Sequence, residues 1–293
     1  MKIFTAICMA LILTMIPGES EGIVEYSRGR LTTVTPAFID SPEEKKEAFF
    51  KIPTSKRDPL FKEFKYYHVV INLPVKFYCY PNDPSFCLIF DYMGTIAGIQ
   101  IGYLEQHAKE VDPIDYNFEN NTNYIKTKIC NKSIYAVRIW FTNPEELKEC
   151  GRTDHSEVIE GLWTYVDGHL MRFDQRCQTV GPSIGCFDLQ GCVPMKGTLY
   201  IYNFNKYSSC KFAFFLFLIY DRHSLVGVGH AAPGNFPPGP HRDWFDRPKG
   251  EKLAQITPSV PHCFAHLLKY GLTSSVTFLI DDPHNIKCPV CGC

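Results

Sequence analysis

From residue 66 onward the chain is a succession of short runs rich in β-branched and aromatic residues. Turn-forming residues separate the runs; Tyr92-Met93-Gly94 and Asp167-Gly168 each lie between two of them, as in a β-hairpin. The runs cover residues 66–71, 76–80, 87–91, 95–103, 134–141, 160–166, 170–173, 198–204, 212–220, 225–228 and 275–280. Strands this closely spaced, without alternating helices, predict a mainly β fold with an antiparallel sandwich or barrel-like body.

One helix is predicted near the C-terminus, packed on the β body. Pro261 suits a first helical position, apolar residues recur at helical spacing over 263–268, and Gly271 suits the end. The Pro-rich stretch 233–240 predicts an irregular loop. We expect a charged N-terminal extension over 23–63 and a single disulfide-rich β domain over 64–293. The alternative is two domains that part at the Pro-rich loop.

The first 22 residues have the layout of a secretory signal peptide. Lys2 is followed by an uncharged apolar stretch over 3–16, then by Pro17-Gly18 and the small residues Ser20 and Gly22. The stretch is shorter than the roughly 20 residues that a membrane-spanning helix needs. We therefore expect a secreted, extracellular protein without a membrane span. The dibasic pair Lys56-Arg57 leaves open a propeptide that ends there, although a solvated loop fits better.

Cysteine usage agrees with export. Cys8 lies in the signal peptide, and an even number of cysteines remains, which indicates up to six disulfides. The candidates are Cys79, Cys87, Cys130, Cys150, Cys177, Cys186, Cys192, Cys210, Cys263, Cys288, Cys291 and Cys293. Spacing does not determine the pairing, but Cys79 and Cys87 flank a turn and suit a local bridge. The Cys288–Cys293 tail resembles a metal or redox motif, yet it lacks a second ligand pair, so disulfides are favoured and no metal or cofactor is expected.

Two sequons are candidate sites for N-linked glycans. Asn120-Asn121-Thr122 lies in a polar, Asn-rich run, and Asn131-Lys132-Ser133 precedes a predicted strand. Asn120 is the better candidate because its surroundings are the more polar.

Three patterns suggest catalysis or metal binding, and each has a simpler interpretation. Gly181-Pro182-Ser183-Ile184-Gly185 matches a nucleophile motif, but no helical pattern follows Ser183, so a disulfide-tied loop fits better. His262 and His266 share a helix face, but the glutamate of a metalloprotease motif is absent between them. A third group, around the Pro-rich loop, suits either a ligand or ordinary packing; its members are His230, His241, Arg242 and Asp243.

Charge excludes one class of partner. The chain has 30 Lys and Arg against 31 Asp and Glu, and its basic residues do not cluster with its aromatic residues. A nucleic-acid-binding surface needs such clustering, so no nucleic-acid partner is expected.

Several segments resemble a poorly characterised group of secreted, cysteine-rich invertebrate proteins, some of them found in venom. The segments are 88–100, Gly161-Leu162-Trp163, Gly197-Thr198-Leu199-Tyr200 and the stretch from Trp244 through Pro261-His262-Cys263 to Gly271-Leu272-Thr273. The resemblance implies a venom or secretion component, and it assigns no catalytic residues.

The sequence favours a non-enzymatic role. The leading expectation is a secreted protein that binds an extracellular protein or a small ligand, because catalytic motifs are weak and cysteines are many. The first alternative is a secreted hydrolase that uses Ser183 or a His-centred site. The second is a structural or defence protein of the extracellular space.

Overall fold

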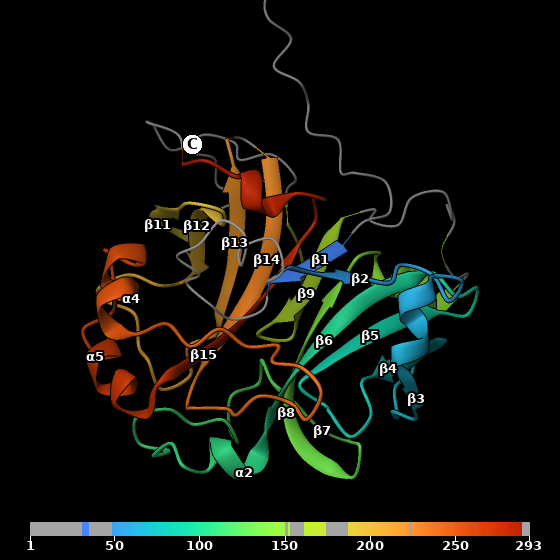
Figure 1. The fold of residues 1–293 in the computed structure, drawn as a ribbon. Helices are drawn as coiled ribbons and strands as arrows, with labels where there is room; N and C mark the ends of the chain where they lie inside the picture. The colour runs from blue at the N-terminus through green and yellow to red at the C-terminus, as the bar shows by residue number, and fades with distance from the viewer. Residues whose placement is uncertain are drawn as a thin grey trace, which may run out of the picture.

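The computed structural model describes residues 31–34, 49–149, 152, 161–173, 187–222 and 224–288. Of the described residues, 43% lie in strands and 13% in helices. The strands form two antiparallel sheets that lie beside each other (Figure 1). The predicted class, a mainly β sandwich tied by disulfides, is confirmed.

The first sheet has eight strands, and its path order is β10-β9-β8-β6-β5-β4-β3, with β7 paired to β8. Its strands are β3 (Lys65–Tyr67), β4 (Val75–Cys79), β5 (Phe86–Asp91), β6 (Ile96–Leu104), β7 (Ile125–Ile129), β8 (Lys132–Trp140), β9 (Leu162–Val166) and β10 (His169–Phe173). Both predicted hairpins are present, β5–β6 and β9–β10. In the second hairpin Asp167 and Gly168 have φ of 50° and 79°, the left-handed values that tight hairpin turns require.

The second sheet has seven strands in the order β11-β12-β13-β14-β15-β1-β2. Its strands are β1 (Leu31–Val34), β2 (Phe49–Ile52), β11 (Phe187–Val193), β12 (Gly197–Tyr202), β13 (Phe215–Asp221), β14 (Ser224–Pro233) and β15 (Leu272–Phe278). Because β1 and β2 belong to this sheet, the β fold reaches further toward the N-terminus than the expected boundary at residue 64. The side chain of Ile52 is part of the core, which explains why this stretch is ordered with the sheet.

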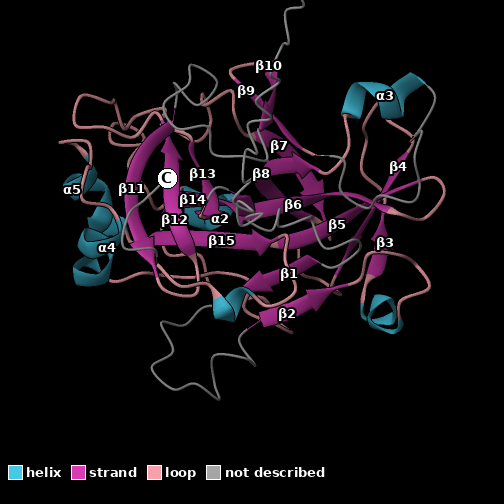
Figure 2. Cartoon of the chain, turned by 90° about the horizontal axis from the view of Figure 1, so that it is seen from above, coloured by secondary structure: helices cyan, strands magenta, loops and turns pink. Residues whose placement is uncertain are grey.

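Short helices cover the edges and the outer face of the sandwich. They are the 3-10 turns η1 (Pro59–Glu63), η3 (Leu268–Tyr270) and η4 (Pro283–Asn285) and the α-helices α2 (Glu105–Ala108), α3 (Pro144–Glu149), α4 (Gly250–Ile256) and α5 (Phe264–Leu267). The predicted C-terminal helix is α5 with η3, and it ends at Gly271 with φ of 84°. Figure 2 shows α4 and α5 on the side of the seven-stranded sheet that faces away from the other sheet.

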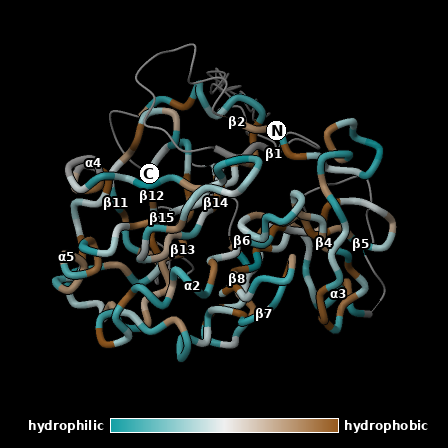
Figure 3. The backbone as a smooth tube through the Cα atoms, turned by 60° about the horizontal axis from the view of Figure 1, so that its bottom comes forward, coloured by the Kyte–Doolittle hydropathy of each residue, from teal (hydrophilic) through white to brown (hydrophobic). Residues whose placement is uncertain are grey.

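Apolar side chains fill the space between the sheets and also cover the far face of the eight-stranded sheet. Every residue of β5 is buried, because one face of this strand packs toward the other sheet and the other face lies under residues such as Leu147 of α3. Two-sided burial explains why the strands read as continuous apolar runs and not as alternating ones. Figure 3 shows the hydrophobic residues along β6, β8 and β13.

Three disulfides connect described cysteines. Cys79–Cys87 joins β4 to β5, as the turn between them predicts, and the others are Cys192–Cys288 and Cys210–Cys263. Cys130 is a free cysteine, and among the described cysteines the other six pair with one another. The candidates Cys150, Cys177, Cys186, Cys291 and Cys293 lie outside the described residues.

Candidate functional site

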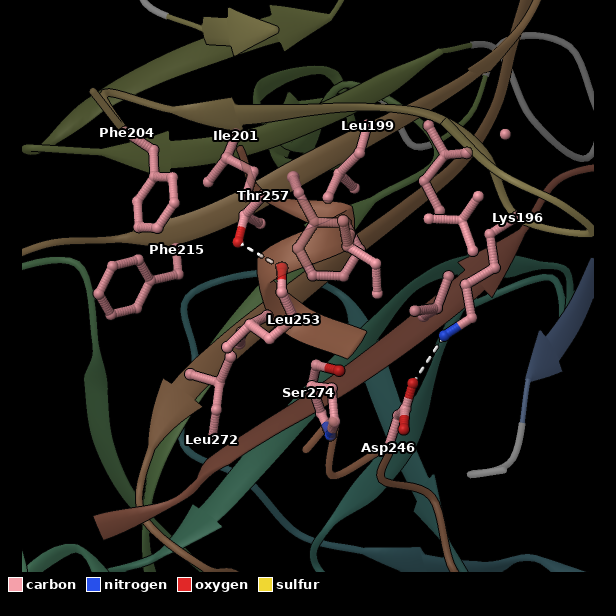
Figure 4. A pocket seen from close by; sticks show the side chains of 18 of the residues that line it. Lys196, Leu199, Ile201, Phe204, Phe215, Asp246, Leu253, Thr257, Leu272 and Ser274 are labelled. Carbon is pink, nitrogen blue, oxygen red and sulfur yellow. Dashed lines mark hydrogen bonds and ion pairs between the residues drawn. The ribbon is translucent and has the colours of Figure 1, made fainter. Parts of the chain in front are cut away.

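A cavity of about 80 Å³ lies between the outer face of the seven-stranded sheet and the helices α4 and α5 (Figure 4). The strands β11 to β15 and the helices α4 and α5 all contribute residues to it. The lining residues are Val193, Lys196, Gly197, Leu199, Ile201, Phe204, Phe215, Phe217, Ile219, Ala231, Asp246, Pro248, Leu253, Ile256, Thr257, Phe264, Leu272, Ser274 and Val276. All but a few of these side chains are apolar, so the cavity offers mainly van der Waals contact.

Strand alternation supplies the floor of the cavity. Successive side chains of a strand point to opposite faces, so every second residue of β12, β13 and β15 reaches this space. On β14 the same face carries Ala231, whose small side chain leaves room, while Ala232 points the opposite way and is fully buried. Gly197 of β12 and Ser274 of β15 are also small lining residues, so several short side chains leave this space open.

The two helices form the wall. Leu253, Ile256 and Thr257 come from α4 and the residue after it, and Phe264 comes from α5. The Thr257 hydroxyl donates to the Leu253 carbonyl at 2.8 Å, so this polar group is satisfied within the wall. The Phe264 ring meets Phe204 edge to face at 5.0 Å between centroids and closes the inner end.

An ion pair marks the other end of the cavity. Lys196 Nζ lies 2.6 Å from Asp246 Oδ2, and the two side chains are 19% and 8% exposed. Figure 4 shows this pair at the opposite end from Phe204 and Phe215. The lining residues that are partly exposed include Lys196, Val193 and Pro248, whereas the Phe204 end is buried. We therefore identify the ion-pair end as the mouth.

The backbone positions both charged residues firmly. Lys196 lies in the β11–β12 turn, where its amide donates to the Val193 carbonyl at 2.9 Å, and Cys192–Cys288 ties this turn to the C-terminal segment. Asp246 exchanges two backbone hydrogen bonds with Ser274 of β15, at 2.7 and 2.8 Å. The mouth is thus held by a disulfide on one side and by a strand on the other.

A second hollow, of about 430 Å³, lies on the surface near α5. Asp115, Lys211, His266 and the disulfide Cys210–Cys263 line part of it. Hydrogen bonds from Lys269 and Tyr270 lower the pKa of Asp115, which therefore stays ionised. This hollow is wider, more polar and more open to solvent than the cavity beneath α4, so it offers a ligand less apolar contact.

The histidine of the Pro-rich loop group lies in the core and not at a surface site. His230 is fully buried between the sheets, and its Nδ1 atom lies 3.0 Å from the hydroxyl of Tyr103. Its Nε2 atom has no hydrogen-bond partner among the described residues. Burial lowers the pKa of His230 to about 3, so the imidazole is neutral at physiological pH.

The other members of that group lie apart from His230. Asp243 forms an ion pair with Arg247 at 2.7 Å, and the Arg242 guanidinium lies over the rings of Phe50 and Trp244. His241 is exposed. His230 therefore lies in the core, whereas the other three residues lie in the loop at the surface.

The remaining candidates divide between exposed and undescribed positions. His262 and His266 are both exposed, and within the described ranges no group of three or more His, Cys, Asp or Glu side chains is arranged to hold a metal ion. Ser183 lies outside the described residues. Asn120 and Asn131 are both exposed, which suits glycan attachment, and their modification stays a prediction.

The chain was compared with protein-family models, with curated proteins and with solved structures. No family model matches it, and no curated protein or solved structure shows significant similarity. Among the described residues no helix has the length and the apolar character needed to cross a membrane. Function must therefore be inferred from the geometry of the site.

The cavity has no local signal in the sequence. Its members are spread over residues 193–276, and α4 has no strong start or stop signal, since Lys249 makes no capping hydrogen bond through its side chain. Lys196 and Asp246 look like ordinary loop charges, 50 residues apart in the chain. Only the folded structure places Lys196 and Asp246 next to each other at the mouth of the cavity.

Proposed function

We propose that this chain is an exported, non-enzymatic binding protein that carries a small apolar molecule in the cavity beneath α4 and α5. The observation that carries the proposal is the cavity itself, with an apolar lining, a buried inner end and a charged mouth. Ligand sites in proteins are concave, mostly apolar and supplied with a few polar groups that orient the ligand. Its volume is well below the roughly 300 Å³ at which sites for drug-sized molecules begin, so the ligand is small.

The energetics support an occupant. An apolar cavity of about 80 Å³ costs about 2 kcal/mol in stability when it is empty, at roughly 24 cal/mol per Å³. A ligand that fills the cavity would recover this lost stability. Apolar cavities stay dry, so water does not compete strongly for the space.

Export is the second part of the proposal. The signal-peptide pattern over residues 1–22 supports it, as do the three disulfides, because disulfides persist in oxidising compartments. The resemblance to secreted invertebrate proteins supports a role as a venom or secretion component. Transcript measurement across tissues tests that role: gland-restricted expression is expected, and broad expression would contradict it.

Thermal unfolding of the mature chain with small apolar probes tests the binding function. We expect xenon, ethane or propane, which are small enough for a cavity of about 80 Å³, to raise the Tm in a concentration-dependent way, because a ligand that binds only the folded state stabilises it. In Ala231→Leu, and in Leu199→Phe as a second blocked variant, the added atoms occupy the cavity and the shift should disappear. A Tm that none of the probes changes in the unmodified chain, or that shifts equally in the blocked variants, would refute the proposal.

A further inference from the structure

A buried arginine lies on the far face of the eight-stranded sheet, the face that points away from the other sheet. On β8 the side chains of Val137 and Ile139 belong to the core between the sheets, whereas Ala136 and Trp140 belong to the apolar cluster on the far face. Successive side chains of a strand alternate between its faces, so Arg138 lies on the far face with Ala136 and Trp140. Only 8% of Arg138 is exposed, although its side chain is charged.

The contacts of Arg138 leave most of its hydrogen-bonding capacity unused. Its Nε atom donates to Gln100 Oε1 at 2.9 Å, since β6 and β8 pair with these two residues opposite each other (Figure 1). The guanidinium also lies over the ring of Phe77, with 5.0 Å between the guanidinium carbon and the ring centroid. Within the described ranges nothing accepts a hydrogen bond from Nη1 or Nη2, which carry all but one of the N–H donors of the group. Gln100 is fully buried, and its Nε2 atom likewise has no partner there.

Arg138 also forms no ion pair with any described residue. Burial lowers the pKa of Arg138 to about 10, and a nearby carboxylate would act in the opposite direction. The other buried arginine of the described chain, Arg152, has a carboxylate partner, since its Nε atom lies 3.4 Å from Asp91 Oδ2. A buried charge is unfavourable unless an opposite charge and hydrogen bonds compensate for its lost hydration. The surroundings of Arg138 therefore favour the binding of an anion.

The free edge of the guanidinium determines which anion fits. Nη1 and Nη2 lie in one plane and form a fork that matches the two oxygens of a carboxylate. The neighbours of Arg138 on the far face include the buried rings of Phe77 and Trp140. A phosphate or sulfate would turn its remaining oxygens toward apolar surface, and these oxygens would lose their hydration without compensation. A carboxylate has only two oxygens, and both of them face the guanidinium.

We infer that Arg138 anchors a carboxylate-binding site on the far face of the eight-stranded sheet. A small monocarboxylate, of which formate is the simplest, pairs with Nη1 and Nη2, while Gln100 holds the guanidinium in place through Nε. The small exposed fraction of Arg138 limits the ligand to compact carboxylates. The site is separate from the cavity beneath α4 and α5, which lies on the other sheet, so the inference does not depend on the proposed function.

Thermal unfolding of the full mature chain in four sodium salts tests the inference. The Tm is measured at neutral pH in formate, acetate, phosphate and chloride at equal ionic strength. Formate and acetate should raise the Tm above its value in chloride, by about 3 °C at about ten times the dissociation constant, because they bind only the folded state. Equal Tm values in formate and in chloride would overturn the inference. A larger rise in phosphate than in formate would overturn the assignment to carboxylates.

Two arginine variants locate the effect of formate. Arg138→Met removes the guanidinium and keeps a long apolar side chain, so the rise of the Tm in formate should disappear. Arg172→Met is the matched control, because Arg172 is an exposed arginine of the same sheet that lies over the ring of Trp163, and the rise should persist in this variant. A rise that persists in Arg138→Met, or that disappears in both variants, would overturn the assignment to Arg138.

A further variant covers the case in which Arg138→Met does not fold. Gln100→Glu places a carboxylate oxygen where Gln100 Oε1 accepts from Arg138, so it supplies the missing negative charge from within the chain. Without any added carboxylate its Tm at neutral pH should exceed that of the unmodified chain, and formate should raise it less. A lower Tm together with an undiminished effect of formate would overturn the inference.

Discussion

Acidification should destabilise this protein through one buried imidazole. His230 is fully buried among Tyr103, Tyr124 and Phe214, none of which carries a charge, and burial lowers its pKa to about 3. In the unfolded chain a histidine titrates near 6.5. The folded-state pKa is the lower one, so the stability from the neutral imidazole is fully present above about pH 6.5 and is lost as the pH falls toward 3.

The magnitude follows from the two pKa values. Between pH 8 and pH 5 the unfolded histidine gains a proton and the buried one does not, which lowers the free energy of unfolding by about 2 kcal/mol. His230→Gln removes the titration, because glutamine does not ionise. The Tyr103 hydroxyl keeps a partner in this variant, since it also donates to the backbone carbonyl of residue 230 at 3.1 Å.

Urea unfolding at pH 8 and at pH 5 measures the effect. The difference between the two pH values should be smaller by about 2 kcal/mol in His230→Gln than in the unmodified chain. His169→Gln serves as the control for the same substitution at an exposed position on β10. The same pH dependence in His230→Gln and in the unmodified chain would refute the claim that the buried imidazole resists protonation.

Three further predictions concern packing, cross-linking and modification. Ala231→Val should raise the free energy of unfolding by about 1 kcal/mol by filling the cavity, whereas Ala232→Val on the opposite face should lower it by about 1–3 kcal/mol through overpacking. Urea unfolding compares the two variants, and equal effects would contradict the presence of the cavity. Replacing both Cys210 and Cys263 with serine should lower the free energy of unfolding by about 4 kcal/mol, because their disulfide spans 53 residues of chain. Denaturant unfolding of the oxidised protein measures this loss, and a loss near zero would refute the presence of the disulfide. Asn120→Gln should reduce the mass of the protein secreted from eukaryotic cells by one glycan, and an unchanged mass on denaturing electrophoresis would show that the exposed sequon is not used.

Local patterns predicted the features of the fold that local chemistry controls. The β9–β10 hairpin follows from Asp167-Gly168, since these residues accept the positive φ that a tight turn needs. Cys79 and Cys87 were expected to pair because they flank a short turn, and the antiparallel register of β4 and β5 places them directly opposite each other. These outcomes need no knowledge of distant parts of the chain.

Long-range features were not predictable in the same way. The bridge Cys192–Cys288 spans 96 residues, and no spacing rule selects it over other pairings. His230 looked like a loop residue next to the Pro-rich stretch, but β14 extends to Pro233 and carries the imidazole into the core. The neighbouring residue Ala231 faces the cavity only because β14 pairs with β13 and β15 in one particular register.

A crystal structure of the mature chain pressurised with xenon tests the central claim most directly. The account predicts electron density for xenon between the seven-stranded sheet and α4, among the apolar side chains that line the cavity. The claim would be contradicted by a cavity that stays empty at saturating ligand, or by ordered water in its place.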